Sequence, residues 1–165
     1  MRKLVPVSDV IPLDQHETAF WRPLTRILTV LPRALEEQFI AETGVTMTDY
    51  TVLVSLSDAP DRQLRLSELA EVTALSLSRI SRVVEDLARR GLVRKWKCER
   101  DGRASNAGLT EAGHAKLTAA YPGHLTRVRA SVFQHLSAKD VRTAAPILAR
   151  LAAALDAAHR EQGAS

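Results

Sequence analysis

The chain has 165 residues and a formal net charge of +4, with 45% hydrophobic and 25% charged residues. This length fits one compact domain with an added helical part, and the composition excludes a disordered chain. Aromatic residues make up 4%, while alanine and leucine are abundant, which favours a helical core over a β-sandwich. No apolar run approaches the about 18 residues of a membrane span, and neither a signal peptide nor a cysteine pair is present. We therefore expect a cytoplasmic protein that is not attached to a membrane.

The chain begins with a predicted arm and a long helix. Residues 1–13 contain two prolines and no periodic pattern, which predicts an extended arm. Asp14 can form a capping box with Glu17 and open a helix that runs to about residue 43. Pro23 and Pro32 each remove an intrahelical hydrogen bond and are expected to bend or break this helix. Its apolar residues recur at spacings of three and four: Phe20, Leu24, Ile27, Leu28, Leu31, Leu35 and Phe39.

A second helix is predicted to begin at Thr46, which can form a capping box with Asp49. A proline-containing loop follows at residues 57–61. Residues 64–66 alternate between apolar and charged types, and this segment is long enough only for a very short strand.

The next segment predicts two helices joined by a tight turn. Ser67 is expected to cap a short helix over residues 68–72, and residues 73–75 form the turn. Ser76 then caps a helix that runs to about residue 90. Four apolar residues of this helix share one face and are expected to point into the core: Leu77, Ile80, Val84 and Leu87.

A β-hairpin is predicted directly after this helix. Gly91 ends the helix, and residues 92–98, which include β-branched and aromatic types, predict a strand. Residues 99–104 predict a turn with an Asp-Gly pair at its centre. The returning strand covers residues 105–109.

Two further helices complete the chain. Thr110 caps a long helix, which the Pro122-Gly123 pair is expected to kink or split. Ser137 and Asp140 predict a capping box for the last helix, whose apolar residues are Val141, Ile147, Leu148, Leu151 and Leu155. Apolar stripes on these flanking helices predict a homodimer.

The positive charge is concentrated in the middle of the sequence. Residues 61–107 contain 11 basic and 7 acidic residues, whereas the remainder has 12 of each sign. Residues 89–103 alone contain 7 basic and 2 acidic residues. One basic stripe on an otherwise neutral protein suggests a polyanionic partner, although a solvated basic face is an equally good interpretation of charge alone.

The helix that begins at Ser76 has the surface that a DNA-reading helix needs. Small hydroxyl side chains allow close approach to the duplex, and two arginines can bind a guanine edge or a phosphate. Acidic residues come later, at Glu85 and Asp86, where the helix would leave the groove. The predicted DNA contacts from this helix are Ser76, Ser78, Arg79, Ser81 and Arg82.

The hairpin offers a second DNA contact, because an arginine on a thin ribbon can enter the minor groove. Asp101 is interpreted as a brace that pairs with Arg103, or as a cap of the turn. Two lysines alternate on one strand face and are expected to lie over phosphates. The predicted contacts of the hairpin are Lys95, Lys97, Arg100, Asp101 and Arg103.

Several segments together resemble the MarR (multiple antibiotic resistance regulator) family of transcription factors. They are Met47-Thr48, Leu66-Ser67-Glu68-Leu69-Ala70, Leu87-Ala88-Arg89-Arg90-Gly91-Leu92-Val93, Asp101-Gly102-Arg103 and Leu109-Thr110-Glu111-Ala112-Gly113. The combination of Asp-x-Arg with Leu-Thr-Glu-x-Gly is specific. The resemblance implies a homodimer with helices from both chain ends intertwined. It also implies recognition helices in successive major grooves and a wing arginine in the minor groove.

We therefore predict a mainly α-helical fold with a small β-hairpin wing, a winged helix-turn-helix with flanking dimerisation helices. Residues 46–109 would form the DNA-binding domain, and residues 14–45 and 110–162 the discontinuous dimerisation part. The predicted function is a sequence-specific transcriptional regulator, a homodimeric repressor of a palindromic operator with half-sites about 34–36 Å apart.

The family resemblance also implies a pocket for a small aromatic or anionic effector. Three residues that lie near one another on the first predicted helix, Trp21, Arg22 and Arg26, are candidates for its lining, and packing at a dimer seam explains Trp21 equally well. Cys98 is either an ordinary strand residue or, beside Lys97 and Arg100, a redox switch.

Other functions remain as alternatives to a regulator. A sequence-tolerant architectural DNA-binding protein or a helical interaction module with a solvated wing would also fit. No acid/base pair, activated nucleophile or glycine-rich phosphate loop is evident, so neither an enzyme nor a cofactor is predicted. No histidine or cysteine pair has metal-ligand spacing, although a dimer could assemble such a site from separate helices.

Overall fold

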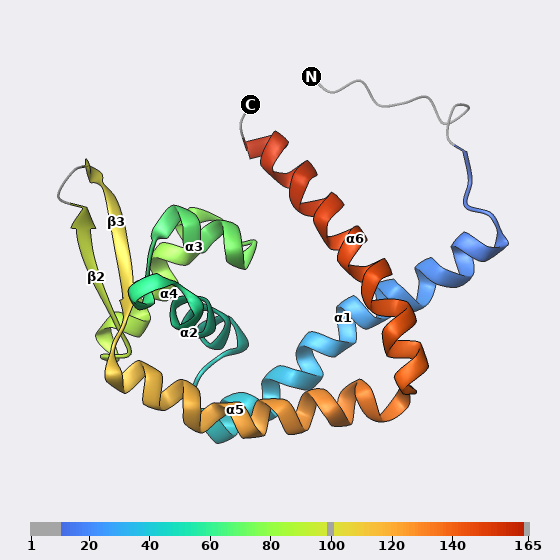
Figure 1. Cartoon of the computed structure of the whole chain (residues 1–165), viewed down its shortest axis with the longest axis horizontal. Helices are drawn as coiled ribbons and strands as arrows, with labels where there is room; N and C mark the ends of the chain where they lie inside the picture. The colour runs from blue at the N-terminus through green and yellow to red at the C-terminus, as the bar shows by residue number, and fades with distance from the viewer. Residues whose placement is uncertain (1–10, 99–100, 164–165) are drawn as a thin grey trace. The chain divides into compact units, whose positions relative to one another are not determined.

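The computed structural model describes residues 11–98 and 101–163 and contains two compact units, residues 1–34 and residues 35–165 (Figure 1). The predicted N-terminal arm lies outside the described residues except for positions 11–13, which have no regular secondary structure.

Helix α1 (Gln15–Thr43) begins with the predicted capping box. The Asp14 N–H donates to Glu17 Oε2 at 2.9 Å, and the Glu17 N–H donates to Asp14 Oδ1 at 2.8 Å. The helix continues through Pro23 and Pro32, so the expected break does not occur. Each proline deprives one carbonyl, four residues earlier, of its intrahelical donor. Both of those earlier residues are exposed, so water can satisfy the carbonyls.

Helix α2 (Met47–Asp58) also begins with the predicted capping box. Thr46 and Asp49 exchange two hydrogen bonds of 3.0 Å, each from a backbone N–H to the other residue's side chain. A short 3₁₀ turn, η2 (Pro60–Arg62), follows.

Strand β1 (Gln63–Arg65) leads directly into α3 (Leu66–Thr73), so the predicted cap at Ser67 is wrong. The N–H of Arg65 donates to Glu68 Oε2 at 2.8 Å, which caps the helix two residues earlier than expected. The first residue of α3, a leucine, is buried and fixes this start against the core.

Helix α4 (Leu77–Arg89) follows a turn in which Ala74 adopts a left-handed conformation, with a φ angle of 53°. Ser76 caps it as predicted, and its Oγ accepts a hydrogen bond from the Arg79 N–H at 3.3 Å. The stripe of Ile80, Val84 and Leu87 is fully buried, whereas Leu77 is 55% exposed, contrary to prediction. Leu77 is the first residue of α4 and lies at the edge of the stripe, so the core does not cover it.

The sheet has three antiparallel strands in the order β1-β3-β2. The β2 strand (Val93–Cys98) pairs regularly with β3 (Asp101–Leu109) until Lys97, which lies opposite Ser105. Cys98 then pairs with Asp101, so residues 102–104 form a bulge. The Asp-Gly pair therefore belongs to β3 and not to the centre of a turn, because the bulge takes up the extra residues.

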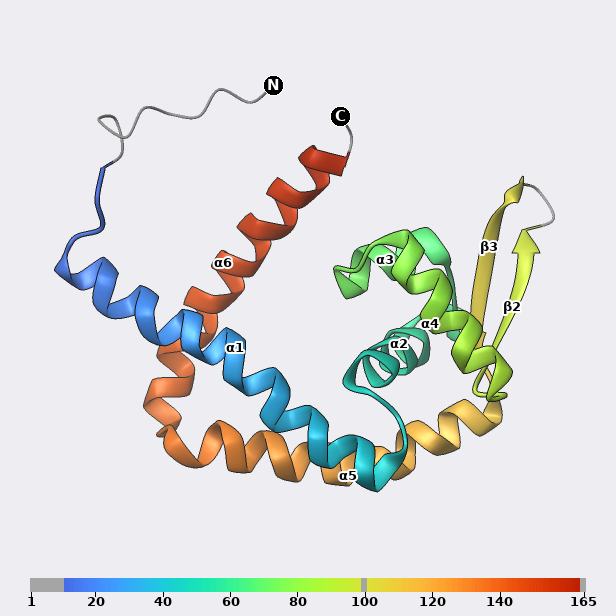
Figure 2. The same cartoon turned by 180° about the vertical axis from the view of Figure 1, so that it is seen from behind.

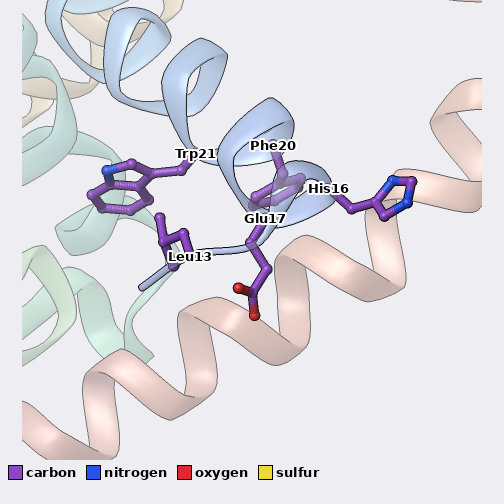
Figure 3. Close-up of a pocket in the computed structure, with 5 residues that line it drawn as sticks. All are labelled: Leu13, His16, Glu17, Phe20 and Trp21. Carbon is purple, nitrogen blue, oxygen red and sulfur yellow. The ribbon is translucent and has the colours of Figure 1, made fainter. Parts of the chain in front are cut away.

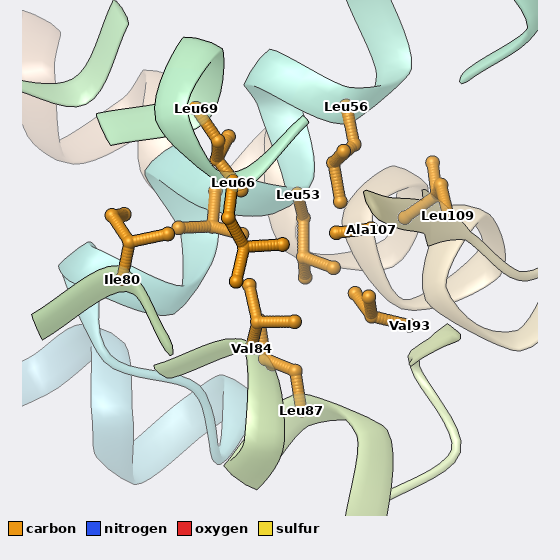
Figure 4. Packing of buried hydrophobic residues seen from close by; sticks show 11 residues of the cluster. Leu53, Leu56, Leu66, Leu69, Ile80, Val84, Leu87, Val93, Ala107 and Leu109 are labelled. Carbon is orange, nitrogen blue, oxygen red and sulfur yellow. The ribbon is translucent and has the colours of Figure 1, made fainter. Parts of the chain in front are cut away.

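Helices α2, α3 and α4 pack together beside this sheet (Figure 2). Their buried side chains and those of the sheet form one apolar cluster (Figure 4), which contains Val52, Leu53, Leu56, Leu66, Leu69, Ile80, Val84, Leu87, Val93, Ala107 and Leu109. A second cluster joins the end of α1 to α2 and α5 through Phe39, Val45, Tyr50 and Ala120.

Helix α5 (Glu111–Ser131) is capped by Thr110, whose Oγ1 accepts from the Gly113 N–H at 3.0 Å. It continues through Pro122, so the expected split does not occur. After the short η3 (Phe133–His135), α6 (Ala138–Gly163) begins with the predicted capping box. In the described part of the chain, no helix combines the length and apolar character needed to cross a membrane.

Candidate nucleic-acid interface

The start of α4 presents small hydroxyl groups and two arginines on one exposed surface. Ser76, Ser78, Arg79 and Arg82 are exposed, and Ser81 is half-buried. The Oγ atoms of Ser76 and Ser78 lie 3.2 Å apart. Among the side chains that the structure describes, neither arginine has an ion-pair partner. Both guanidinium groups are therefore available to an external anion.

The same two arginines also line a hollow of about 440 Å³ between α4 and the α1–α2 connection. Its other charged residues are Glu36, Asp49, Asp86 and Arg90, and the remaining lining residues are Ile40, Gly44, Thr46, Thr48 and Val83. Sequence reasoning did not find this hollow because α4 lies far along the chain from the end of α1 and the start of α2, which supply the other lining residues.

A separate hollow of about 560 Å³ lies within the first unit (Figure 3). Its lining residues are Leu13, His16, Glu17, Phe20 and Trp21. Of the three residues predicted for an effector pocket, Trp21 lines this hollow, whereas Arg22 and Arg26 do not.

Arg90 fixes the end of α4 to the start of α2. Its Nη1 donates to Asp49 Oδ2 at 3.1 Å and its Nη2 to the carbonyl of Gly44 at 2.7 Å. Asp86 accepts from Arg89 at 2.8 Å and from Arg90 at 3.4 Å. The hydrogen bond from Arg89, and then that from Arg90, hold the pKa of the Asp86 carboxyl below its usual value.

Lys95 does not project freely, as its predicted role over a phosphate would require. Its Nζ donates to Glu85 Oε1 at 2.7 Å and to Ser81 Oγ at 3.1 Å. Ser81 Oγ donates in turn to Glu85 Oε1 at 3.1 Å. The hydrogen bond from Lys95, followed by that from Ser81, lowers the pKa of Glu85. We call this set of contacts the Ser81–Glu85–Lys95 bridge.

Lys97 is exposed on the same strand face, as its predicted role requires. On the other face, the Arg94 guanidinium lies 4.9 Å from the ring centroid of Trp96, in a cation–π contact that sequence reasoning missed. Arg94 lies opposite Gly108 in the sheet. A Cβ at Gly108 would come within 3.0 Å of the indole ring, so glycine leaves room for this pair.

At the end of the wing the structure does not describe residues 99–100, and it describes Cys98 and residues 101–103 by their backbone alone. Arg100 lies outside the described residues, as do the side chains of Cys98, Asp101 and Arg103. Arg103 falls within the β3 bulge. The brace between Asp101 and Arg103, their DNA contacts and the redox role of Cys98 therefore stay predictions.

The described residues contain no group of three or more His, Cys, Asp or Glu side chains able to hold a metal ion. One of the five histidines of the chain, His124, packs against aromatic rings. Its ring centroid lies 4.7 Å from that of Tyr50 and 6.0 Å from that of Phe39. Burial, followed by the positive charge of Arg127, lowers the pKa of His124.

A helix, a tight turn and a second helix, followed by an antiparallel hairpin, define a winged helix-turn-helix protein. Residues 43–104 match the MarR family model. The MarR family transcriptional regulator Sco3205 of Streptomyces coelicolor, solved in complex with DNA, is 32% identical, with a TM-score of 0.81 over 87% of this chain and 90% of that one. AbsC, a MarR family transcriptional regulator of the same species, is 32% identical, with a TM-score of 0.80 over 88% of this chain and 98% of that one.

The HTH-type transcriptional repressor YetL of Bacillus subtilis is 31% identical over 94 residues, which are 57% of this chain. The chain spans 56% of the length of that relative. The chain belongs to the MarR family of transcriptional regulators. It is thus a DNA-binding regulator and not an enzyme, and the predicted fold class and family are confirmed.

Proposed function

We propose that this protein binds a palindromic DNA operator as a homodimer and represses transcription from it. The observation that carries the proposal is the exposed start of α4, where Arg79 and Arg82 have no ion-pair partner among the described side chains and stand beside small hydroxyl groups. A helix with this surface can enter the major groove and present its arginines to guanine edges. Sco3205, whose structure is in complex with DNA, supports this use of the fold.

The wing would supply the second contact of each subunit. We propose Lys97, Arg100 and Arg103 as contacts to phosphates and the minor groove, with Asp101 as a brace. The exposed position of Lys97 supports its part in this set. Repression, in preference to activation, is proposed because YetL is a repressor. A regulator of this kind would work in the cytoplasm, where bacterial DNA lies.

A homodimer is proposed because large apolar side chains are exposed on both flanking helices. In the first unit they include Phe20, Trp21, Ile27 and Leu28, and on α6 they include Ile147, Leu148 and Leu155. Apolar stripes of this kind on long helices commonly mark a subunit interface. We propose residues 14–45 and 110–162 as the dimerisation part and residues 46–109 as the reading head.

A small anion is proposed to modulate DNA binding. The hollow beside α4 supports this, because its lining includes Arg79 and Arg82, the two arginines proposed to read DNA. An anion held by either guanidinium would compete with the phosphates and base edges for the same donors. This hollow replaces the Trp21 region as the candidate effector site.

The test compares two labelled duplexes by fluorescence anisotropy at several salt concentrations. One is selected from a randomised pool by the wild-type protein, and the other is its scrambled counterpart. We expect Arg82→Ala to weaken binding to the selected duplex about tenfold or more, with a smaller effect on the scrambled one. Arg103→Ala should lower the slope of log K against log salt by about one.

The outcomes separate the proposed regulator from its alternative. Equal wild-type affinity for both duplexes would indicate a sequence-tolerant architectural protein. If Arg82→Ala or Arg103→Ala bound the selected duplex like wild type, the role assigned to that residue would be wrong. Circular dichroism of each variant checks that the helices are intact.

A further inference from the structure

We propose that the Ser81–Glu85–Lys95 bridge fixes the angle between α4 and the wing, so that both can reach their grooves at once. The proposal rests on the DNA contacts proposed above. It makes Lys95 a positioning residue of the reading head and not a phosphate contact. The bridge connects β2 to the same face of α4 that begins with the proposed DNA contacts.

The position of Lys95 along β2 suits this role. Val93, two residues earlier on the same strand face, is buried in the core, and Lys97, two residues later, is exposed. The side chain of Lys95 is 25% exposed, which is intermediate between the exposure of these two neighbours. Of the wing side chains that the structure describes, Lys95 alone is hydrogen-bonded to α4. The bridge is therefore the outermost polar connection between wing and helix within that set.

The bridge also changes the charge of the reading surface. Glu85 lies one turn after Ser81 on α4, three residues beyond Arg82, and its side chain is 55% exposed. A free carboxylate at this position would repel the phosphates that the neighbouring arginine attracts. The ammonium group of Lys95 offsets this charge at a distance of 2.7 Å. One lysine thus both holds the wing and neutralises the acid of the recognition helix.

Two roles of Lys95 predict opposite effects of removing Glu85. If Lys95 were a phosphate contact, Glu85→Ala would free its ammonium group and remove a negative charge, and DNA binding would tighten. If the bridge positions the wing, Glu85→Ala weakens binding to the preferred sequence although the protein becomes more positive. Lys95→Met keeps the apolar stem of the side chain and removes the hydrogen bonds, and it should weaken the same binding.

The experiment uses the full-length protein and the selected and scrambled duplexes described above. We expect Glu85→Ala and Lys95→Met each to weaken binding to the selected duplex about tenfold, which corresponds to about 1.4 kcal/mol. Binding to the scrambled duplex should change by no more than about twofold, because that binding depends on the phosphate contacts that remain. The double variant should bind about as well as each single one, because both remove the same contact. Lys95→Arg, which can still reach Glu85, should recover most of the affinity.

Lys97→Met is the matched control, since it changes the next residue on the same strand face. It should weaken binding to both duplexes alike and lower the salt slope by about one. Tighter binding by Glu85→Ala would overturn the proposal. If Lys95→Met lost affinity equally for both duplexes and had a lower salt slope, the proposal would also be overturned, and Lys95 would be a phosphate contact.

A measurement without DNA separates the bridge from the proposed function. Amide hydrogen exchange in β2 should become faster in both bridge variants, because the strand loses its polar connection to α4. Unchanged exchange would overturn the bridge even if the protein binds DNA as proposed. If exchange became faster but the wild-type protein bound the selected and scrambled duplexes equally well, the bridge would be supported and the proposed function contradicted.

Discussion

At the scale of single residues, two adjacent arginines at the end of α4 have different roles. Arg90 donates to Asp49 and to the carbonyl of Gly44, and its side chain is 32% exposed. Arg89 pairs with Asp86, and its side chain is 76% exposed. Because Asp49 is buried, the loss of its arginine would leave a carboxylate with little access to water. An exposed pair contributes much less to stability.

We therefore predict that Arg90→Met lowers the free energy of unfolding by about 1–2 kcal/mol, a value reduced for the partial exposure of the arginine. The methionine keeps the apolar stem, so the loss reports the three hydrogen bonds of the guanidinium, to Asp49, Asp86 and the Gly44 carbonyl. Arg89→Met is the control and should change stability by no more than about 0.5 kcal/mol. Urea unfolding followed by circular dichroism measures both. Equal losses in the two variants would show that Arg90 has no special connection to α2.

The sequence predicted residue roles well where the partners are close in the chain. Three capping boxes were expected, beginning at Asp14, Thr46 and Ser137, and all three are confirmed. Each depends on hydrogen bonds across three residues, which spacing alone reveals. The role of Lys95 depends on partners 10 and 14 residues away on another element. No local pattern could have shown that its charge is already paired.

At the scale of elements, the helices α1 and α5 illustrate what local rules miss. Their internal prolines were expected to bend or break α1 and to kink or split α5, and both helices are continuous, so neither the break nor the split occurs. A proline removes one hydrogen bond, and an exposed carbonyl can exchange that bond for water. A local rule counts the lost hydrogen bond but not the surroundings of the carbonyl. The Ser67 cap failed for a similar reason, since the buried Leu66 decided where α3 begins.

Gly113 in the first turn of α5 is a further constraint between elements. A Cβ at this position would overlap the backbone carbonyl of Leu92 and lie 2.8 Å from a methyl carbon of Leu109. The glycine therefore allows α5 to start in direct contact with the chain that follows α4. This contact explains the last position of the Leu-Thr-Glu-x-Gly segment without reference to DNA.

We predict that Gly113→Ala lowers the free energy of unfolding by about 1–3 kcal/mol or more, because backbone atoms must move to admit the methyl group. In an exposed helix the same change would raise the free energy of unfolding by about 1 kcal/mol. The sign of the measured change therefore distinguishes the two situations. The matched control is Gly123→Ala in the same helix. Its Cβ would meet the ends of two side chains that pair with each other, Arg127 at 3.2 Å and Glu42 at 3.4 Å, and not backbone atoms. That variant should be no less stable than wild type, as judged by urea unfolding.

At the scale of the whole molecule, the apolar side chains of the reading head are buried in its core, whereas those of the last helix are exposed. The cluster beneath α4 and the sheet is fully enclosed, as the sequence pattern of Ile80, Val84 and Leu87 predicted. The stripe of α6 was predicted from the same kind of periodicity. Within the described chain its leucines remain exposed, with Leu148 at 53% and Leu155 at 62%. Periodicity identifies a face that must be covered, but it does not say whether the cover comes from the same chain.

The dimer proposal predicts that Leu148→Glu produces a monomer. A carboxylate in the middle of an apolar seam would lose its water without gaining a partner, so the dimer dissociation constant should rise at least about a hundredfold. The α6 helix itself should persist, because the substitution is exposed in the single chain and glutamate is a good helix former. Ala153→Glu is the matched control. It adds the same charge on the opposite side of α6, at 100° per residue, and should remain dimeric.

Size-exclusion chromatography with light scattering over a range of concentrations gives the oligomeric state, and anisotropy gives the DNA affinity of the same samples. A monomer carries one reading head, so it should lose its preference for the selected palindrome while retaining weak binding to both duplexes. If the Leu148→Glu protein stayed dimeric, the proposal that α6 forms part of the dimer interface would be wrong. A monomer that still binds the palindrome with wild-type affinity would show that one winged helix is sufficient, and the proposed pairing of reading heads would be wrong.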